Sequence, residues 1–136
     1  MPSLAEWIPP TVRRLGCTQV IVAAGINDMV RTDVVAPVGA ACCRLVDALE
    51  SAGVQVWLAT VTPYRQDDAG WAQALNGRRL RWNDWLRAFM PDRLIDWESG
   101  LRSGQWMRTD LSLDGLHPNA AGQQVLASAF AATWHA

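Results

Sequence analysis

The sequence has little charge and little cysteine, and both shortages narrow what the protein can be. Only 18% of its 136 residues are charged, and the formal net charge is −1. This balance argues against binding nucleic acid or an anionic membrane through general electrostatic attraction. The three cysteines are an odd number, and Cys42 and Cys43 are adjacent, which suits neither a disulfide framework nor a spaced set of metal ligands. We expect reduced thiols in a hydrophobic core.

Long apolar runs and targeting signals are also missing. No apolar stretch reaches the roughly 20 residues that span a bilayer, and the N-terminus has no charged segment followed by an apolar one. The sequence as given therefore predicts a cytoplasmic protein, a prediction that holds only if no segment precedes it. What is present is an apolar fraction of 50%, sufficient for one domain with its own core.

Three segments predict strands. The first run starts at Gln19 and ends at Ala24, and its apolar residues do not alternate with polar ones, which is typical of a strand buried on both faces. Residues 54–60 form a second such run. Residues 93–97 predict a third, shorter strand, followed by an irregular stretch over residues 98–119.

Apolar residues at helical spacing predict helices between and around these strands. A short helix is expected between the Pro9-Pro10 pair and Gly16, because consecutive prolines interrupt a helix. Residues 36–52, 71–89 and 120–134 predict amphipathic helices. The first of these places six residues on one face: Val38, Ala41, Cys42, Leu45, Val46 and Leu49. Four arginines of the second are expected on solvated faces: Arg78, Arg79, Arg81 and Arg87.

The order of these elements predicts a three-layer α/β/α sandwich. Strands that alternate with helices call for right-handed crossovers and a parallel sheet covered on both faces. Ligands of such sheets bind beyond the carboxyl ends of the strands. Residues 25–28, residues 60–64 and the long final loop should therefore meet at one site.

The sharpest local motif is Gly25-Ile26-Asn27-Asp28, directly after the first predicted strand. An asparagine in this place can aim its side-chain amide at the oxyanion that develops during acyl transfer. Asparagine and aspartate after glycine are also ordinary turn formers. Taken alone, the motif fits an oxyanion site and a simple turn equally well.

A second motif, Asp114-Gly115-Leu116-His117-Pro118-Asn119, lies in the predicted final loop. A tight turn would let the Asp114 carboxylate hydrogen-bond one imidazole nitrogen of His117 and leave the other facing outward, which makes an acid-base dyad. The same residues also suit a turn followed by a helix start, with His117 an incidental loop residue. For this motif in isolation, the turn interpretation is the favoured one.

Together, in this order and spacing, the two motifs resemble those of the SGNH (GDSL-like) hydrolase family. The resemblance implies that Asn27 belongs to an oxyanion hole and that Asp114 and His117 form the catalytic dyad. The sequence VWLATVTP at residues 56–63 is similar to the family's strand between these blocks. The resemblance also implies a flavodoxin-like fold, hydrolysis of a small-molecule ester, and no metal or organic cofactor.

The first two blocks of that family are not found. The first is a Gly-Asp-Ser sequence at the end of the first strand, and the second supplies a glycine to the oxyanion hole. None of the serines follows Gly-Asp; they are Ser3, Ser51, Ser99, Ser103, Ser112 and Ser128. We therefore expect residues 1–136 to form one domain of this fold without its first strands, nearly inactive by itself, with the nucleophilic serine outside the chain.

The missing first strand has a structural consequence. The family places that strand beside the one that precedes Asn27, so its absence leaves the run from Gln19 to Ala24 at a sheet edge. An apolar, unprotected edge invites pairing with another chain. We expect the chain to self-associate, to bind a complementing N-terminal fragment, or to be part of a longer protein.

Two other hypotheses stay open at this point. A degenerate hydrolase fold could serve as a non-catalytic binding module, which accounts for the missing serine but not for the retained Asp114, His117 and Asn27. A flavodoxin-like domain with chance motif matches would need a glycine-rich phosphate-binding loop, and the sequence has none. Eight tryptophans could suggest sugar binding, but their positions in predicted helices and strands favour core packing.

Overall fold

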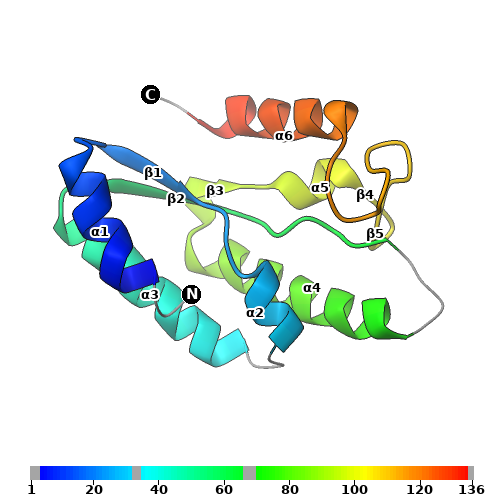
Figure 1. Cartoon of the computed structure of the whole chain (residues 1–136), viewed down its shortest axis with the longest axis horizontal. Coiled ribbons are helices and arrows are strands. Elements are labelled where there is room, and N and C mark those ends of the chain that lie inside the picture. Colours follow the sequence, from blue (N-terminus) through cyan, green and yellow to red (C-terminus); the bar gives the residue numbers. More distant parts are fainter. Residues whose placement is uncertain (1–3, 32–34, 66–69, 135–136) are drawn as a thin grey trace.

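A computed structural model of the chain describes residues 4–31, 35–65 and 70–134, without the side chains of Arg31 and Trp71. Helices and strands alternate over most of its length (Figure 1). The elements are α1 (Leu4–Arg14), β1 (Gln19–Val22), α2 (Ile26–Arg31), α3 (Val35–Ser51), β2 (Gln55–Ala59), α4 (Trp71–Phe89), the 3-10 helix η1 (Pro91–Arg93), β3 (Leu94–Ile95), α5 (Trp97–Leu101), β4 (Arg102–Ser103), β5 (Trp106–Met107) and α6 (Ala120–Thr133). No helix within the described ranges is long and apolar enough to cross a bilayer.

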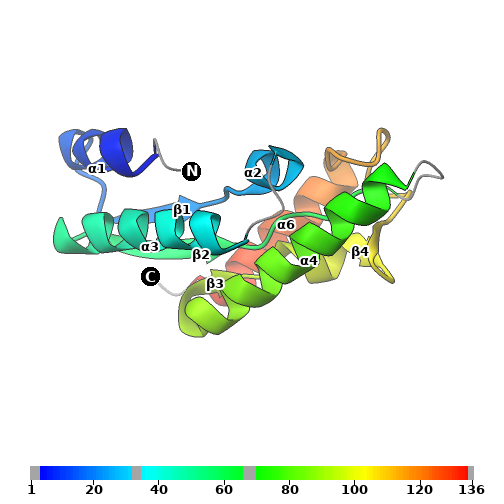
Figure 2. The same cartoon turned by 90° about the horizontal axis from the view of Figure 1, so that it is seen from below.

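The main sheet is parallel, as predicted. Its strand order is β1-β2-β3, with Val20 opposite Val56 and Leu58 opposite Leu94. A separate two-stranded antiparallel hairpin is formed by β4 and β5. Helix α6 covers one face of the main sheet, and α1, α3 and α4 cover the other (Figures 1 and 2). These are the three layers expected of an α/β/α sandwich, with the hairpin at one end.

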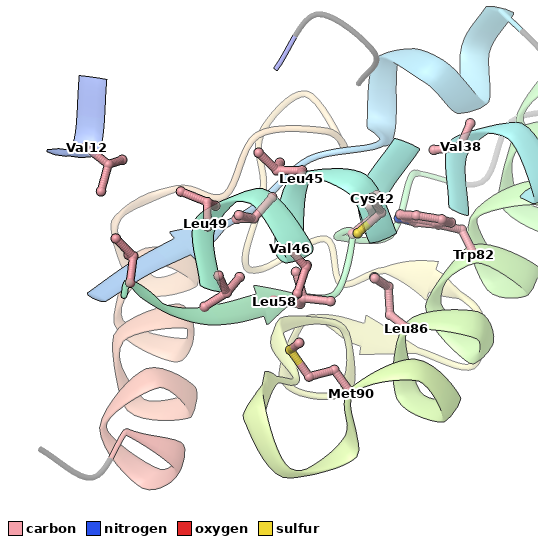
Figure 3. Close-up of a cluster of buried hydrophobic side chains, with 14 of the residues drawn as sticks. Val12, Val38, Cys42, Leu45, Val46, Leu49, Leu58, Trp82, Leu86 and Met90 are labelled. Atoms are coloured by element: carbon pink, nitrogen blue, oxygen red, sulfur yellow. The ribbon is translucent and has the colours of Figure 1, made fainter. Parts of the chain in front are cut away.

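Helix α3 supplies the centre of the larger hydrophobic core. All six residues predicted for its inner face are buried. Five of them, Val38, Cys42, Leu45, Val46 and Leu49, belong to a core cluster that also contains residues of β2 and α4 (Figure 3). Leu45, Leu49 and Trp82 are completely buried. Removing this much apolar surface from water is the main force that holds α3 on the sheet. The helical spacing of apolar residues was therefore sufficient to predict both α3 and its orientation.

Helix α1 corrects the prediction that Pro9 and Pro10 confine helix to the residues after them. The helix begins at Leu4 and runs through both prolines to Arg14. The fixed φ of proline is compatible with a helix. Pro9 and Pro10 each lack the backbone N–H that would donate a helical hydrogen bond. Pro9 and Val12 are buried where α1 packs against α3, and this burial offsets the lost hydrogen bonds.

Three smaller expectations also need correction. Strand β1 is not buried on both faces, because Ile21 is 36% exposed and Gln19 and Val20 are only partly buried. Cys42 is buried in the core, and burial raises the pKa of its thiol to about 12, but Cys17 is exposed. Residues 98–119 are not irregular throughout, since they contain most of α5 and the β4–β5 hairpin.

Candidate active site

His117 and Asp114 are joined directly in the loop before α6. His117 Nδ1 lies 2.7 Å from Asp114 Oδ2, and their side chains are 78% and 56% exposed. The Asp114 Oδ1 atom accepts hydrogen bonds from the backbone N–H groups of Leu116 and His117. The hydrogen bond from the His117 ring, followed by these two backbone bonds, holds the pKa of Asp114 well below its usual range. The Asp114 carboxylate can thus orient the ring, and the Nε2 atom of His117 has no protein partner among the described residues.

Backbone turns and a buried serine shape this loop. Gly115 adopts a φ of +76°, a left-handed conformation that glycine takes without strain. The buried Ser112 hydroxyl accepts a hydrogen bond from the Gly115 N–H and donates one to the His117 carbonyl. Asn119 caps α6 by accepting from the Gly122 N–H at 3.0 Å. Both local interpretations of this motif are thus present, because it forms a turn and a helix start that also hold a histidine–carboxylate pair.

The Asn27 motif sits at the exit of β1, where the strand turns into the short helix α2. Gly25 makes that turn with a φ of +113°, and a Cβ there would lie 2.6 Å from Trp82 Nε1. Glycine is therefore required both by the backbone conformation and by the close approach of Trp82. Asn27 follows on the exposed side of α2, and its side-chain amide has no hydrogen-bond partner within the described residues.

The predicted meeting of three segments occurs. A pocket of about 550 Å³ is lined by Asn27 and Val30 from α2, by Thr62 and Tyr64 after β2, and by the loop that carries His117. The backbone joins these segments as well, because the Arg65 N–H donates to the Gly115 carbonyl at 2.7 Å. Asn27, Asp114 and His117 thus border one concave site at the carboxyl ends of the strands.

The segment after β2 is held by the Asn83 side chain, whose amide makes the two hydrogen bonds that a neighbouring strand would make. Asn83 of α4 accepts from the Val61 N–H and donates to the Val61 carbonyl, both at 2.8 Å. Asn83 is fully buried and also donates to Glu98 at 3.0 Å. The wall of the pocket at residues 62–65 is therefore anchored from beneath, through α4, to the start of α5.

Arg79 is the clearest departure from the predicted solvated arginine face. Its side chain is completely buried, and Nη1 donates to Glu98 Oε1 at 2.5 Å. It also donates to Asn76 and to the Gln105 carbonyl. Burial by itself would raise the pKa of Glu98, but hydrogen bonds from Arg79 and Arg87 outweigh burial and lower it. The pair is thus ionised and joins α4, α5 and the hairpin.

No serine within the described residues is placed to act with His117. Ser112 is the nearest in sequence, but its hydroxyl bonds to the Gly115 N–H and the His117 carbonyl rather than to the ring. Ser99 and Ser128 bond to Asp96 and to the Gln124 carbonyl. No serine lines the pocket of His117. Ser3 lies outside the described residues.

The part of the chain that the structure describes holds no cluster of metal ligands. Residues 4–31, 35–65 and 70–134 contain no cluster of three or more histidine, cysteine, aspartate or glutamate side chains that could hold an ion. The three predicted site residues bring one imidazole, one carboxylate and one amide to the pocket. Such a set is suited to acid-base chemistry with an amide hydrogen-bond donor.

Sequence reasoning missed the supporting residues Arg79, Asn83 and Glu98, although α4 carried a usable signal. Arg79 and Asn83 follow Leu75 at intervals of four residues and share the helix face of Trp82 and Leu86, which is buried. A polar residue inside an apolar stripe predicts a buried hydrogen-bonding role. The identity of its partner could not be read from that stripe.

Comparison with known families and structures bears on the family and the fold of the chain. The GDSL-like Lipase/Acylhydrolase family matches residues 3–125. Three solved structures share the fold. A GDSL-like lipase from Bacteroides thetaiotaomicron has 14% identity and a TM-score of 0.75 over 94% of this chain and 67% of its own. A catalytic mutant of an acetylxylan esterase from Geobacillus stearothermophilus has 17% identity and a TM-score of 0.72 over 96% and 65%.

The third structure is the OSK domain of Drosophila Oskar, with 18% identity and a TM-score of 0.75 over 97% of this chain and 70% of its own. At such identities the similarity shows the fold. This chain spans about two thirds of the length of these structures. No curated protein matches it in sequence.

Proposed function

Because this chain belongs to the GDSL-like lipase/acylhydrolase family, we propose that it supplies the general base and part of the oxyanion hole of an ester hydrolase. The nucleophile is a serine that these 136 residues do not provide. The substrate is a small-molecule ester. The proposed roles are His117 as base and then acid, Asp114 as its orienting carboxylate, and Asn27 as an oxyanion donor.

The chemistry follows ordinary acyl transfer. The serine oxygen bonds to the ester carbonyl carbon while His117 Nε2 takes the hydroxyl proton, and the carbonyl oxygen becomes an oxyanion that the Asn27 amide donates to. The carbon–oxygen bond to the alcohol then breaks, and His117 returns the proton to the leaving alcohol. Water repeats both steps on the acyl-enzyme and releases the acid.

One observation carries this proposal. Asn27 and the Asp114–His117 pair come from opposite ends of the chain, yet they line the same pocket. A dyad with a 2.7 Å bond and an amide without a protein partner are the groups that such chemistry needs. The catalytic mutant of the related acetylxylan esterase replaces a serine with alanine, which supports a serine as the missing group.

The position of β1 supports a place for that serine. Strand β1 is an edge of the described sheet, and Ile21 on it is 36% exposed. A strand paired with β1 would run beside the turn at Gly25 and end near Asn27. The partner of this chain is accordingly a strand that ends in Gly-Asp-Ser, either in a longer form of the polypeptide or in a separate fragment.

Ester hydrolysis tests the proposal. Turnover of p-nitrophenyl acetate is measured for the 136-residue chain, for a form extended upstream at the gene level, and for the extended form with His117→Ala. We expect only the extended form to be active, with His117→Ala lowering its kcat by on the order of a millionfold. Equal activity of the His117→Ala form would contradict the role of His117.

The edge of β1 has its own test. Light scattering after size-exclusion chromatography should show that the 136-residue chain self-associates, because its apolar edge is open, whereas the extended form is a monomer. A stable, monodisperse monomer of the 136-residue chain would argue against an exposed pairing edge.

A second candidate function is supported by the absence of a serine from the pocket lining. In that case the fold binds an acyl or sugar ligand in the pocket without cleaving it. This function predicts that the extended form is as inactive as the 136-residue chain, while both bind the ligand. The hydrolase is preferred because ligand binding alone does not require His117 and Asp114 to be held 2.7 Å apart.

A further inference from the structure

A second hollow adjoins the pocket of His117, and the two share Arg65. It has a volume of about 640 Å³ and is lined by the β4–β5 hairpin and the residues after it, including Arg102, Trp106 and Arg108. Arg65 also lines the His117 pocket. Arg65 therefore contributes to the wall of both hollows.

Arg65 is held firmly by its backbone. Its N–H donates to the Gly115 carbonyl at 2.7 Å, and the carbonyl of the preceding residue, Tyr64, accepts from the Met107 N–H at 2.8 Å. Its side chain lies directly against Gly115, where an added Cβ would come within 2.1 Å of the Arg65 Cβ. The glycine of the catalytic loop thus leaves room for Arg65 to lie between the loop and the hairpin.

The charge of this second hollow is unbalanced. Arg108 is paired with Asp110 at 2.6 Å. Arg65 and Arg102 are exposed and form no ion pair with a carboxylate in the described part of the chain, although Arg102 donates to the Gly104 carbonyl. Two guanidinium groups and the half-buried ring of Trp106 therefore face one hollow. Arginine in such a place favours carboxylate or phosphate oxygens, which its planar group can bind in pairs.

We infer that Arg65, with Arg102, selects esters whose alcohol portion carries an oxyanion such as a phosphate or carboxylate. This rests on the proposed function, because His117 must return its proton to the leaving alcohol and so lies beside it. The loop of His117 is the one that Arg65 packs against. The apolar residues Ile26, Val30 and Leu116 line the remainder of the first pocket and suit the acyl group.

Binding of the alcohol product tests this inference without requiring turnover. The 136-residue chain is titrated with sn-glycerol 3-phosphate, uncharged glycerol and inorganic phosphate, while the amide signals of Arg65 and Gly115 and the indole signal of Trp106 are followed by NMR. We expect saturable shifts with sn-glycerol 3-phosphate, weaker binding of inorganic phosphate, and none with glycerol. Asp67 and Asp68 follow Arg65 in the sequence. Because the titration uses the full chain, the measured affinity includes the effect of these two carboxylates.

Matched variants identify the residue responsible. Arg65→Ala should weaken the binding of sn-glycerol 3-phosphate at least tenfold and Arg102→Ala less, while Arg44→Ala, an exposed arginine on α3, should leave it unchanged. The inference would be overturned by equal affinity for glycerol and sn-glycerol 3-phosphate. It would also be overturned if Arg65→Ala and Arg102→Ala both left the affinity for sn-glycerol 3-phosphate unchanged. Because hydrolysis is not measured, an inactive extended form would count against the proposed function only.

Discussion

The pair formed by Glu98 and Arg79 and the pair formed by Asp114 and His117 differ in burial and in use. Glu98 and Arg79 are 2% and 0% exposed. Glu98 also accepts hydrogen bonds from Asn83 and Arg87, and Arg79 donates one to Asn76. Asp114 and His117 are 56% and 78% exposed, and the pair is held by its own loop. The contacts are of similar length, 2.5 and 2.7 Å. The two pairs differ clearly in how far their surroundings exclude water.

That difference in burial separates a pair that stabilises the fold from a pair that is available for proton transfer. A buried charge is tolerated only when all its hydrogen bonds are made, so Glu98 has no capacity left for a ligand. An exposed pair contributes little to stability, but its free nitrogen can reach a substrate and exchange protons. The buried pair holds the walls of the pocket, and the exposed pair faces into it.

Removal of the Glu98 charge should give the largest effect. Glu98→Gln leaves Arg79 buried without a counter-charge, so we expect the free energy of unfolding to fall by about 3–5 kcal/mol. Urea denaturation followed by circular dichroism measures this. Asp110→Asn, which breaks the exposed pair with Arg108, is the matched control and should leave the midpoint unchanged. A similar urea midpoint for the two variants would show that the buried pair stabilises the fold no more than an exposed pair does.

Acid should weaken the buried pair next. The pKa of Glu98 in the folded chain is below its ordinary value of 4.5, so its stabilising effect is complete above that value and is lost as the pH falls through the folded pKa. Unfolding free energy measured between pH 7 and pH 3 should therefore drop more steeply in the natural sequence than in Glu98→Gln. Parallel pH profiles would show that Glu98 is not the titrating group.

Ser112→Ala tests the support of the exposed pair. It leaves the Gly115 N–H and the His117 carbonyl without their buried partner, so we expect a loss of about 1 kcal/mol. The amide signals of residues 114–117 should also shift in NMR spectra. Ser128→Ala, at an exposed hydroxyl on α6, is the control and should change neither quantity.

His117→Ala should have the smallest effect on stability. The side chain is 78% exposed and bonds only to Asp114, so the thermal midpoint should match that of the natural sequence. The same substitution abolishes the proposed activity of the extended form. A clear fall in the thermal midpoint would mean that His117 also has a structural role.

The core of the fold could be predicted from spacing. Apolar residues at helical intervals were sufficient for α3, and the runs at residues 19–24 and 54–60 were sufficient for the two longer strands of the sheet. Because the carboxyl ends of parallel strands meet at one edge of the sheet, the sequence predicts that Asn27 and His117 border one pocket. Their separation within that pocket was not predictable.

The sequence by itself determined the order of elements, the buried face of α3 and the motifs that identify the family. Tertiary structure alone decided that Arg79 is buried with Glu98, that α1 continues through its prolines, and that Arg65 lies against Gly115. The physical reason is that apolar periodicity reports which face of an element leaves water. The burial of a polar group or a helix-breaking residue depends instead on a partner from a distant segment, and that partner is chosen by packing.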